Sequence, residues 1–107
     1  MYLNEYQRLA RRTANHLTPS SMIENGILGM CGESGECADI LKKFYYQGHE
    51  LDKEHLIEEL GDVLWYVALM ASGLQIDLDE VAQRNIDKLM KRYPDGFDPE
   101  KSKNRTE

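Results

Sequence analysis

The chain has 107 residues, of which 41% are hydrophobic and 30% are charged, and this is the composition of one small soluble domain. Nineteen acidic against thirteen basic residues give a formal net charge of −6. This charge argues against duplex nucleic acid as a partner, because phosphate contacts require a basic surface. The sequence has no run of 18 apolar residues and no apolar signal-peptide core, so it predicts neither membrane insertion nor secretion. A cytoplasmic location is therefore expected.

The first half of the chain has the apolar periodicity of two helices. One is expected over residues 4–17, and Pro19 then suits the start of a second helix over residues 20–47. Gly48 is a good stop signal for that second helix. No strand-like alternation interrupts the pattern, which favours an all-α fold.

The second half predicts two further helices. Asp52 can cap a third helix that carries residues 56–74. Asp77, with Glu80 three residues later, predicts a capped fourth helix, which ends before Pro94 because proline cannot continue it.

The chain therefore reads as a single helical domain over residues 1–98 with a polar tail over residues 99–107, and it contains no internal repeat. The tail has no helical periodicity, so it is expected either to be loose or to fold over a neighbour.

The cysteines and histidines do not form a metal set. Cys31 and Cys37 are six residues apart in a helical pattern, and no further cysteine or suitably spaced histidine completes a zinc site. They are predicted to be reduced packing residues. His16, His49 and His55 are expected at the surface or in loops, since none lies beside the acidic motifs at ligand spacing.

Two pairs of acidic residues interrupt the apolar helical patterns. On the second helix Glu33 lies at the border of the apolar stripe and Glu36 lies further round. On the third helix Glu59 lies at the border and Asp62 lies further round by the same angle and in the same sense. If the two helices form an antiparallel hairpin across residues 48–51, both pairs fall on one side of it. Their heights then differ by about one helical turn, on the order of 5 Å. The pattern therefore predicts that four carboxylates converge.

Converging carboxylates repel one another and lose hydration unless protons or a cation compensate. A hard divalent cation, Mg²⁺ with Mn²⁺ as a substitute, is the direct solution. The alternative is two ordinary solvated helix faces. Gly32, Gly35 and Gly61 beside the acids each cost about 1 kcal/mol relative to alanine, and the close approach of a neighbouring helix or a ligand would explain them.

The fourth helix has a second irregularity, because Asn85 interrupts its apolar stripe and Lys88 and Arg92 lie beside it. An amide and two cations on one face could hold a base or sugar and anionic oxygens. The alternative is a satisfied buried amide with two solvated cations. Tyr66 is either core or a pocket wall, and Lys43 is either a surface lysine or a phosphate contact.

Three motifs resemble the MazG-like branch of the all-α nucleoside triphosphate pyrophosphohydrolases over about residues 20–100. They are GESGE (residues 32–36), EELGDVLWYVALMA (58–71) and NIDKLMKRYPDGF (85–97). The resemblance implies a four-helix bundle completed by dimerisation or tetramerisation. It also implies Mg²⁺-dependent cleavage of a nucleoside triphosphate between the α and β phosphorus atoms, which releases a nucleoside monophosphate and pyrophosphate.

The resemblance also assigns roles to individual residues. It puts the metal at Glu33, Glu36, Glu59 and Asp62. It assigns substrate contacts to the ending of the fourth helix and to one aromatic position, namely Asn85, Lys88, Arg92, Tyr93 and Tyr66. Either Glu36 or Glu33 could take the proton of the attacking water. The charge of the leaving pyrophosphate would be neutralised by Lys43, Lys88 and Arg92, which could come from one chain or from two.

Two other function classes compete with this interpretation. A carboxylate-bridged di-iron bundle requires Glu-x-x-His pairs, and no histidine follows either acidic pair at that spacing. A non-catalytic helical dimer that acts as a nucleotide- or protein-binding module would be indifferent to Mg²⁺. The nucleobase that the substrate carries stays open, because Ser34 and Cys37 depart from fuller family patterns.

Overall fold

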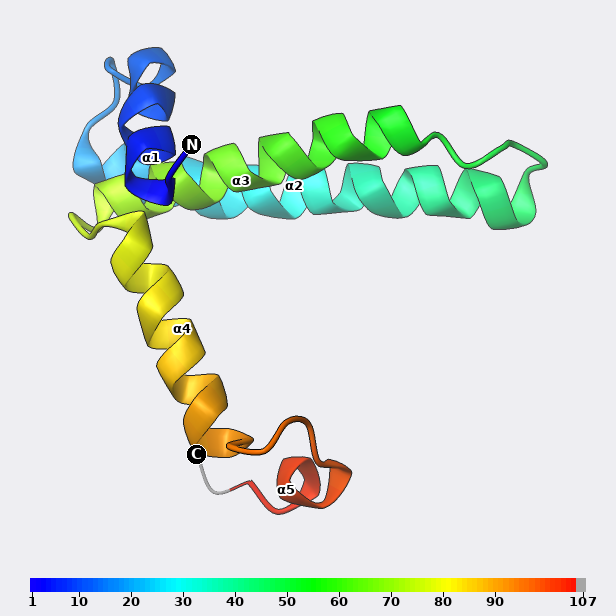
Figure 1. Cartoon of the computed structure of the whole chain (residues 1–107). Coiled ribbons are helices and arrows are strands. Elements are labelled where there is room, and N and C mark those ends of the chain that lie inside the picture. The colour runs from blue at the N-terminus through cyan, green and yellow to red at the C-terminus, as the bar shows by residue number, and fades with distance from the viewer. Residues whose placement is uncertain (106–107) are drawn as a thin grey trace.

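The computed structural model describes residues 1–105, and within them the chain is helical and contains no strand. The predicted all-α fold is confirmed. In chain order (Figure 1) the elements are α1 (Leu3–Ala10), the 3-10 helix η1 (Arg11–Thr13), α2 (Pro19–Tyr46), α3 (Lys53–Gly73), α4 (Leu78–Arg92) and α5 (Pro99–Lys103). The predicted polar tail thus contains the short helix α5, and its residues 106 and 107 lie outside the described part. Over residues 1–105, no helix combines the length and the hydropathy that a bilayer crossing requires.

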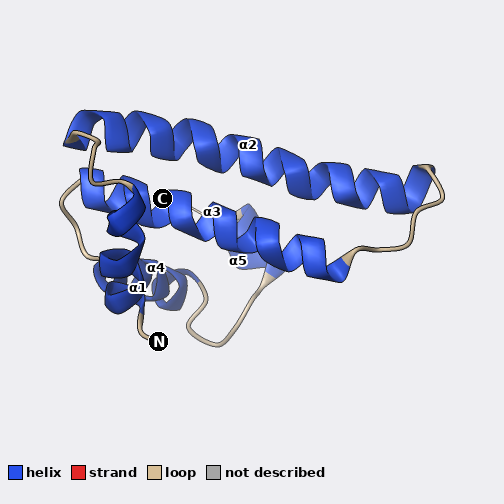
Figure 2. Cartoon of the chain, turned by 90° about the horizontal axis from the view of Figure 1, so that it is seen from above, coloured by secondary structure: helices blue, strands red, loops and turns tan. Residues whose placement is uncertain are grey.

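The long helices α2 and α3 form an antiparallel hairpin and lie side by side along their length (Figure 2). Both begin at a side-chain cap, of which the one at Asp52 was predicted, whereas Pro19 was the predicted start signal of α2. The Thr18 hydroxyl accepts a hydrogen bond from the Ser21 amide at 3.2 Å, with Pro19 in the first turn, and the Asp52 carboxylate accepts from the His55 amide at 3.0 Å. These side chains satisfy amides that would otherwise have no partner at each helix start.

Glycines in the contact between α2 and α3 allow the two helices to approach each other closely. A Cβ on Gly26 would lie 2.9 Å from the Cβ of Met70, and the ring of Tyr66 occupies the space that a side chain at Gly29 would need. A Cβ on Gly73 would likewise lie 2.8 Å from the carbonyl oxygen of Pro19 at the start of α2. Side chains at these positions would force the helices apart.

The glycines beside the acidic residues are different. A Cβ on Gly32, Gly35 or Gly61 would meet nothing within 4 Å. The expectation that a neighbouring helix explains them is therefore wrong within this chain, because these residues point away from the contact between α2 and α3.

Alanine substitution is expected to have opposite effects at these two kinds of glycine. Gly26→Ala should lower the free energy of unfolding by about 1–3 kcal/mol, because its methyl group overpacks the contact with α3. Gly32→Ala should raise it by up to about 1 kcal/mol, because helix propensity improves without a clash. Urea denaturation followed by circular dichroism measures both, and a loss of stability in Gly32→Ala would contradict the open space beside it.

The predicted first helix is broken after its second turn. The carbonyl of Ala10 accepts a hydrogen bond from the indole Nε1 of Trp65 at 3.3 Å, and the Thr13 hydroxyl accepts from the same nitrogen at 3.1 Å. The Ala14 amide then bonds to Arg11 at 3.0 Å, in the 3-10 pattern. A tertiary contact with α3 therefore ends a helix that the sequence alone extends to residue 17.

The start of α4 is held by α1 and not by its own aspartate. Asp77 stands at the N-cap, as predicted, but its side chain makes no capping hydrogen bond. Instead, Gln7 Oε1 accepts from the Leu78 amide at 2.7 Å and Asn4 Oδ1 accepts from the Asp79 amide at 2.9 Å. Gln7 is only 7% exposed and also donates to the carbonyl of Ile76. The direction in which α4 leaves the hairpin is thus fixed by α1.

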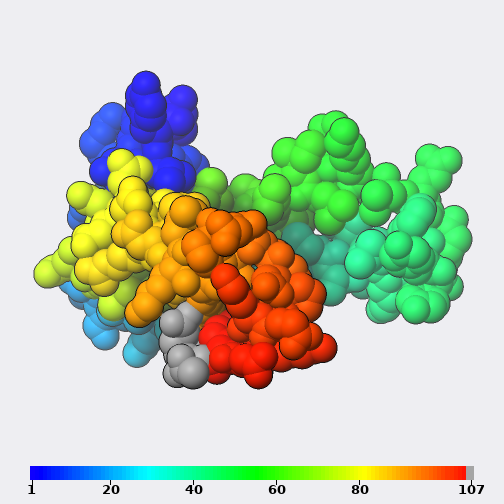
Figure 3. Space-filling model, turned by 60° about the horizontal axis from the view of Figure 1, so that its bottom comes forward, coloured from blue at the N-terminus to red at the C-terminus, as the bar shows by residue number. Residues whose placement is uncertain are grey.

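The single chain is open. The loop end of the hairpin extends free of the other helices (Figure 3), and α4 runs away from the hairpin (Figure 1). The radius of gyration is 16.9 Å, compared with about 13 Å for a compact domain of this length. The two cysteines are free, as predicted, but Cys31 is exposed, so a packing role for it is wrong within one chain.

The hairpin has two unlike sides. On one flank of the contact between α2 and α3 lie the acidic motifs, and we call this the acidic side. The opposite flank, which we call the apolar side, carries exposed or half-buried hydrophobic residues from both helices: Ile27, Leu41, Phe44, Leu60, Val63 and Val67.

Candidate active site

Three carboxylates from two helices meet on the acidic side. Glu33 on α2 and Glu59 and Asp62 on α3 each offer one oxygen, and these oxygens lie within 4.8 Å of one another. The antiparallel register of the hairpin brings them to the same height. The Glu59 side chain is 12% exposed, Glu33 is half-buried and Asp62 is exposed, so the cluster is open to solvent on one side.

Glu36 is not in this group of three. It follows Glu33 by three residues, so it lies about 4.5 Å further along α2 towards the hairpin loop. There it lines a separate hollow with Lys43 and His55. The structure thus brings three of the four predicted carboxylates together and leaves Glu36 one turn away.

The crowding changes the protonation of Glu33. Its pKa is raised to about 7, first by a hydrogen bond with Glu59, then by loss of hydration, and then by the negative charges of Glu59, Asp62 and Glu36. When the carboxyls are ionised, no residue of the described chain donates a hydrogen bond to the buried Oε2 of Glu59. This buried oxygen therefore has no hydrogen-bond partner within the described residues.

His55 is a site residue that the sequence interpretation missed. His55 is exposed at the surface, as predicted, but its Nε2 lies 3.1 Å from Glu59 Oε1, in the first turn of α3. The expectation that no histidine lies beside the acidic motifs is therefore wrong for His55. The signal was present, since residues four apart on a helix are neighbours. Glu59 therefore has one oxygen held by His55 and one buried oxygen facing the other carboxylates.

Lys43 lies on the acidic side, but its ammonium group is already paired with Asp39. Its Nζ is 3.1 Å from Asp39 Oδ2, and Lys42 lies 3.5 Å from the other oxygen. The hydrogen bond and charge of Lys43 lower the pKa of Asp39, and Lys42 adds to the effect. Asp39 was not singled out from the sequence, and it holds Lys43 beside the hollow that Glu36 lines.

Two tyrosines border the cluster. The half-buried ring of Tyr66 lies against Gly29 across the hairpin and packs edge-on against Trp65, with ring centroids 5.1 Å apart. Tyr6 comes from α1, and burial followed by the charge of Asp62 raises its pKa. Sequence reasoning missed Tyr6, because only tertiary packing places α1 beside α3.

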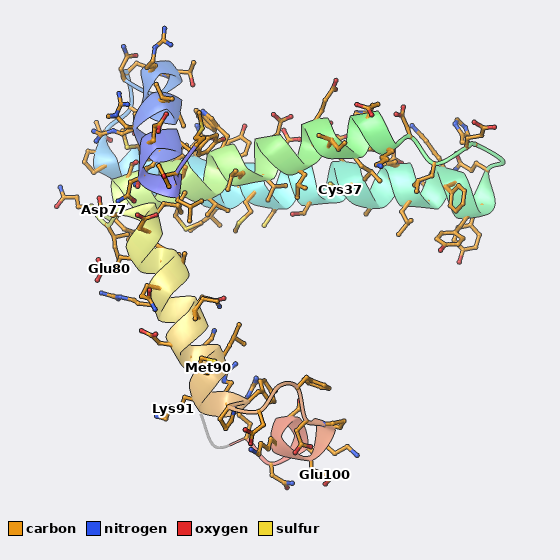
Figure 4. All side chains as sticks on the ribbon, viewed as in Figure 1. Cys37, Asp77, Glu80, Met90, Lys91 and Glu100 are labelled. Atoms are coloured by element: carbon orange, nitrogen blue, oxygen red, sulfur yellow. The ribbon has the colours of Figure 1, made fainter. Side chains whose placement is uncertain are left out.

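The predicted substrate residues of α4 do not reach the carboxylates within one chain. Asn85 and Lys88 are exposed and make no hydrogen bond or ion pair within residues 1–105. The alternative of a buried amide at Asn85 is thus not met in a single chain. Met90 and Lys91 lie near the far end of α4, well away from the hairpin (Figure 4), and Tyr93 next to them is half-buried against Phe97.

A family model described as the MazG nucleotide pyrophosphohydrolase domain matches residues 22–97. The chain belongs to this MazG family. It is also similar to the gene 37 protein of Mycobacterium phage L5, with 40% identity over 73 residues. That alignment covers 64% of this chain and 64% of the relative, so less than two thirds of the relative is matched. No solved structure matches this chain.

The carboxylate cluster of this MazG domain suits a hard divalent cation. It offers oxygen ligands only, which Mg²⁺ and Mn²⁺ prefer. The buried oxygen of Glu59 has no hydrogen-bond partner within the described residues, and the pKa of Glu33 is raised by its hydrogen bond with Glu59, by lost hydration and by the neighbouring negative charges. A cation would relieve both effects, so the residues present fit a metal site.

Proposed function

We propose that this MazG domain, over residues 1–98, is a Mg²⁺-dependent nucleoside triphosphate pyrophosphohydrolase, with Mn²⁺ as a possible substitute. It would split the α–β phosphoanhydride of a nucleoside or deoxynucleoside triphosphate into a monophosphate and pyrophosphate. The observation that carries the proposal is the cluster of three carboxylate oxygens within 4.8 Å, in a chain of this family. Since nucleoside triphosphates are cytoplasmic metabolites, the proposal places the chain in that compartment.

The reaction adds water across a phosphoanhydride, so one P–O bond forms, another breaks, and a proton leaves the water. Glu33, Glu59 and Asp62 would hold the cation, which when bound neutralises phosphate charge and lowers the pKa of a water molecule. Glu36 lies one turn away from these ligands and makes no ion pair within residues 1–105. It is therefore our candidate to accept the proton, with Glu33 as the second candidate.

The remaining predicted residues have binding roles in the proposal. Tyr66 would form a wall of the nucleotide pocket, since its ring spans the hairpin next to the carboxylates. Lys43, held by Asp39, would lie beside the phosphates. The ending of α4 would contact the base, sugar or phosphates through Asn85, Lys88, Arg92 and Tyr93.

The proposal includes assembly of the chain into a homodimer or a homotetramer. The chain exposes 8022 Å², whereas a compact monomer of 12.4 kDa exposes roughly 6,100 Å². The excess of roughly 1,900 Å² exceeds the 800 Å² or so that each partner buries in a standard interface. Much of it is hydrophobic, including the apolar side of the hairpin.

The test is pyrophosphate release from a panel of canonical and modified nucleoside triphosphates, with Mg²⁺, with Mn²⁺ and with chelator. We expect release of monophosphate and pyrophosphate with either metal, none with chelator, and recovery when metal is restored. A folded, metal-loaded protein that releases no pyrophosphate from any of them would overturn the proposal. Metal-independent binding of nucleotide without turnover would instead support the non-catalytic module.

A further inference from the structure

A hollow of about 460 Å³ lies where α1 meets the end of the hairpin at which α2 begins and α3 ends. Its volume is in the range of small-molecule sites. Its walls come from one face of α1, from the start of α2 and from the connection between α3 and α4. Ser72, in one of these walls, is thirteen residues beyond Glu59 and hence about 20 Å away along α3. The hollow is therefore separate from the carboxylate cluster.

The wall of the hollow that α1 supplies is basic. Arg8 and Arg11 both line it, and residues three apart on a helix are neighbours on one face. Neither arginine makes an ion pair within residues 1–105. They are two of the three arginines in residues 1–17, a segment that contains a single acid in a chain of net charge −6. Two neighbouring guanidinium groups suit a phosphate, whose oxygens accept their paired hydrogen bonds.

The wall at the end of α3 contains a residue in an unfavourable backbone conformation. Gln75 has a φ of 59°, in the left-handed region that favours glycine. Its amide donates to the Ser72 carbonyl at 3.0 Å, and the Ile76 amide donates to the Ala71 carbonyl at the same distance. This is the Schellman ending of a helix, in which the left-handed position is usually glycine. Glutamine at this position costs stability, and its side chain lines the hollow, which indicates a binding role.

The other walls offer a carboxylate and apolar surface. Asp77 lies at the junction of the hairpin with α4 (Figure 4) and also lines the hollow. Its carboxylate makes neither a capping hydrogen bond nor an ion pair in the described part of the chain. Leu17, Pro19 and Met22 add apolar surface beside it. The hollow thus combines partners for an anion, for hydroxyl groups and for an apolar ring.

The walls are held in place within the single chain. Gln7 is only 7% exposed, and its amide nitrogen donates to Ser72 Oγ at 3.2 Å and to the Ile76 carbonyl at 3.0 Å. Its Oε1 accepts from the Leu78 amide at 2.7 Å. These hydrogen bonds join α1 to the connection between α3 and α4, so the hollow is formed before a ligand enters it. A preformed site lowers the entropic cost of binding.

We propose that this hollow binds a phosphate monoester of the size of a nucleoside monophosphate, as a second ligand site of the chain. The phosphate lies on Arg8 and Arg11, the Gln75 side chain donates a further hydrogen bond, and Asp77 accepts from the sugar hydroxyls. The ligand joins α1 to the connection that leads into α4. This site uses none of the residues of the carboxylate cluster, so it does not depend on the proposed reaction.

The test is binding of the nucleoside 5′-monophosphates to the full chain in chelator, which removes metal-dependent binding at the carboxylate cluster. Ribose 5-phosphate, inorganic phosphate and the free nucleosides are the comparison probes. In NMR titrations of ¹⁵N-labelled protein, the amide resonances of residues 4–11 and 72–77 should move, and those of Glu33, Glu59 and Asp62 should not. A monophosphate should bind at least about tenfold more tightly than inorganic phosphate or a nucleoside, because only the monophosphate contacts both the arginines and the apolar wall.

Substitutions in the walls identify the contacts. Arg8→Gln and Arg11→Gln should each raise the dissociation constant by about 10- to 100-fold, as the loss of a charged hydrogen bond does. Arg12→Gln is the matched control, because Arg12 is adjacent but does not line the hollow. It should bind as wild type does. Gln75→Gly separates binding from folding, since it should raise the melting temperature by relieving the backbone and yet weaken binding by about 3- to 10-fold.

Three results would overturn the inference. The first is no binding of any monophosphate at millimolar concentration, and the second is equal affinity for inorganic phosphate, which would reduce the site to a general anion contact. The third is unchanged binding in both arginine variants, or resonance shifts confined to the carboxylate cluster. Absence of pyrophosphate release by the wild-type protein would count against the proposed reaction alone, because none of these measurements requires turnover.

Discussion

Replacing Glu59 with glutamine is expected to reduce pyrophosphate release by roughly 10³-fold, which corresponds to about 4 kcal/mol of transition-state stabilisation. Glu59 is the carboxylate at the centre of the cluster, because one of its oxygens is held by His55 and the other is buried beside the other two acids. Glutamine keeps the shape but removes the charge. Metal titration by calorimetry should show a parallel loss of Mg²⁺ or Mn²⁺ binding.

The same substitution should change the stability of the metal-free protein in a pH-dependent way. The pKa of Glu33 is raised above its ordinary value, so folded wild type binds a proton more strongly than the unfolded chain and gains stability as pH falls through about 7 towards 4.5. Without the charge of Glu59 this gain should shrink. Melting temperatures between pH 8 and pH 5 in chelator measure it. Glu58→Gln, at the neighbouring exposed position, is the control, and equal behaviour of the two variants would contradict the assigned role of Glu59.

Replacing Leu60 with aspartate is expected to weaken self-association by 10³-fold or more. Leu60 is 66% exposed in the single chain and lies in the shallow apolar hollow of α3. Burial of one leucine contributes about 2 kcal/mol, and an unpaired buried charge costs several more. In a two-fold symmetric interface each substitution occurs twice. Sedimentation equilibrium measures the dissociation constant.

Leu28→Asp provides the matched control for that experiment. Leu28 is 72% exposed on α2, but it points away from both α3 and the apolar side. The Leu28→Asp substitution should therefore leave the oligomeric state unchanged. Dissociation by Leu28→Asp, with none by Leu60→Asp, would move the interface to the outer face of α2.

The elements that local patterns control were predicted well from the sequence. The start signal at Pro19, the cap at Asp52 and the stop near Gly48 depend on neighbouring residues, so the bounds of the hairpin helices agree with expectation to within a residue or two. The approach of Glu33, Glu59 and Asp62 also followed from helical periodicity and a short connection.

The features that the sequence did not predict depend on tertiary contacts. The early end of α1 follows from the hydrogen bonds of Trp65, and the capping of α4 by Gln7 joins residues 71 positions apart. The periodicity of apolar residues within one helix gives no information about such contacts between helices. The expectation that a neighbouring helix covers the glycines beside the acids failed for the same reason, since the sequence does not show which flank of a helix another helix will cover.

The hydrogen bonds from Asn4 and Gln7 to the start of α4 also bear on the entropy of assembly. A tethered helix that tumbled freely would lose its orientational freedom when a second chain bound it. Here that freedom is already lost when each chain folds, because two side chains of α1 hold the first amides of α4. Pre-organisation of this kind lowers the entropic cost of association. In the proposed oligomer, the N-terminal helix would thus lower the entropic cost of combining two copies of the chain.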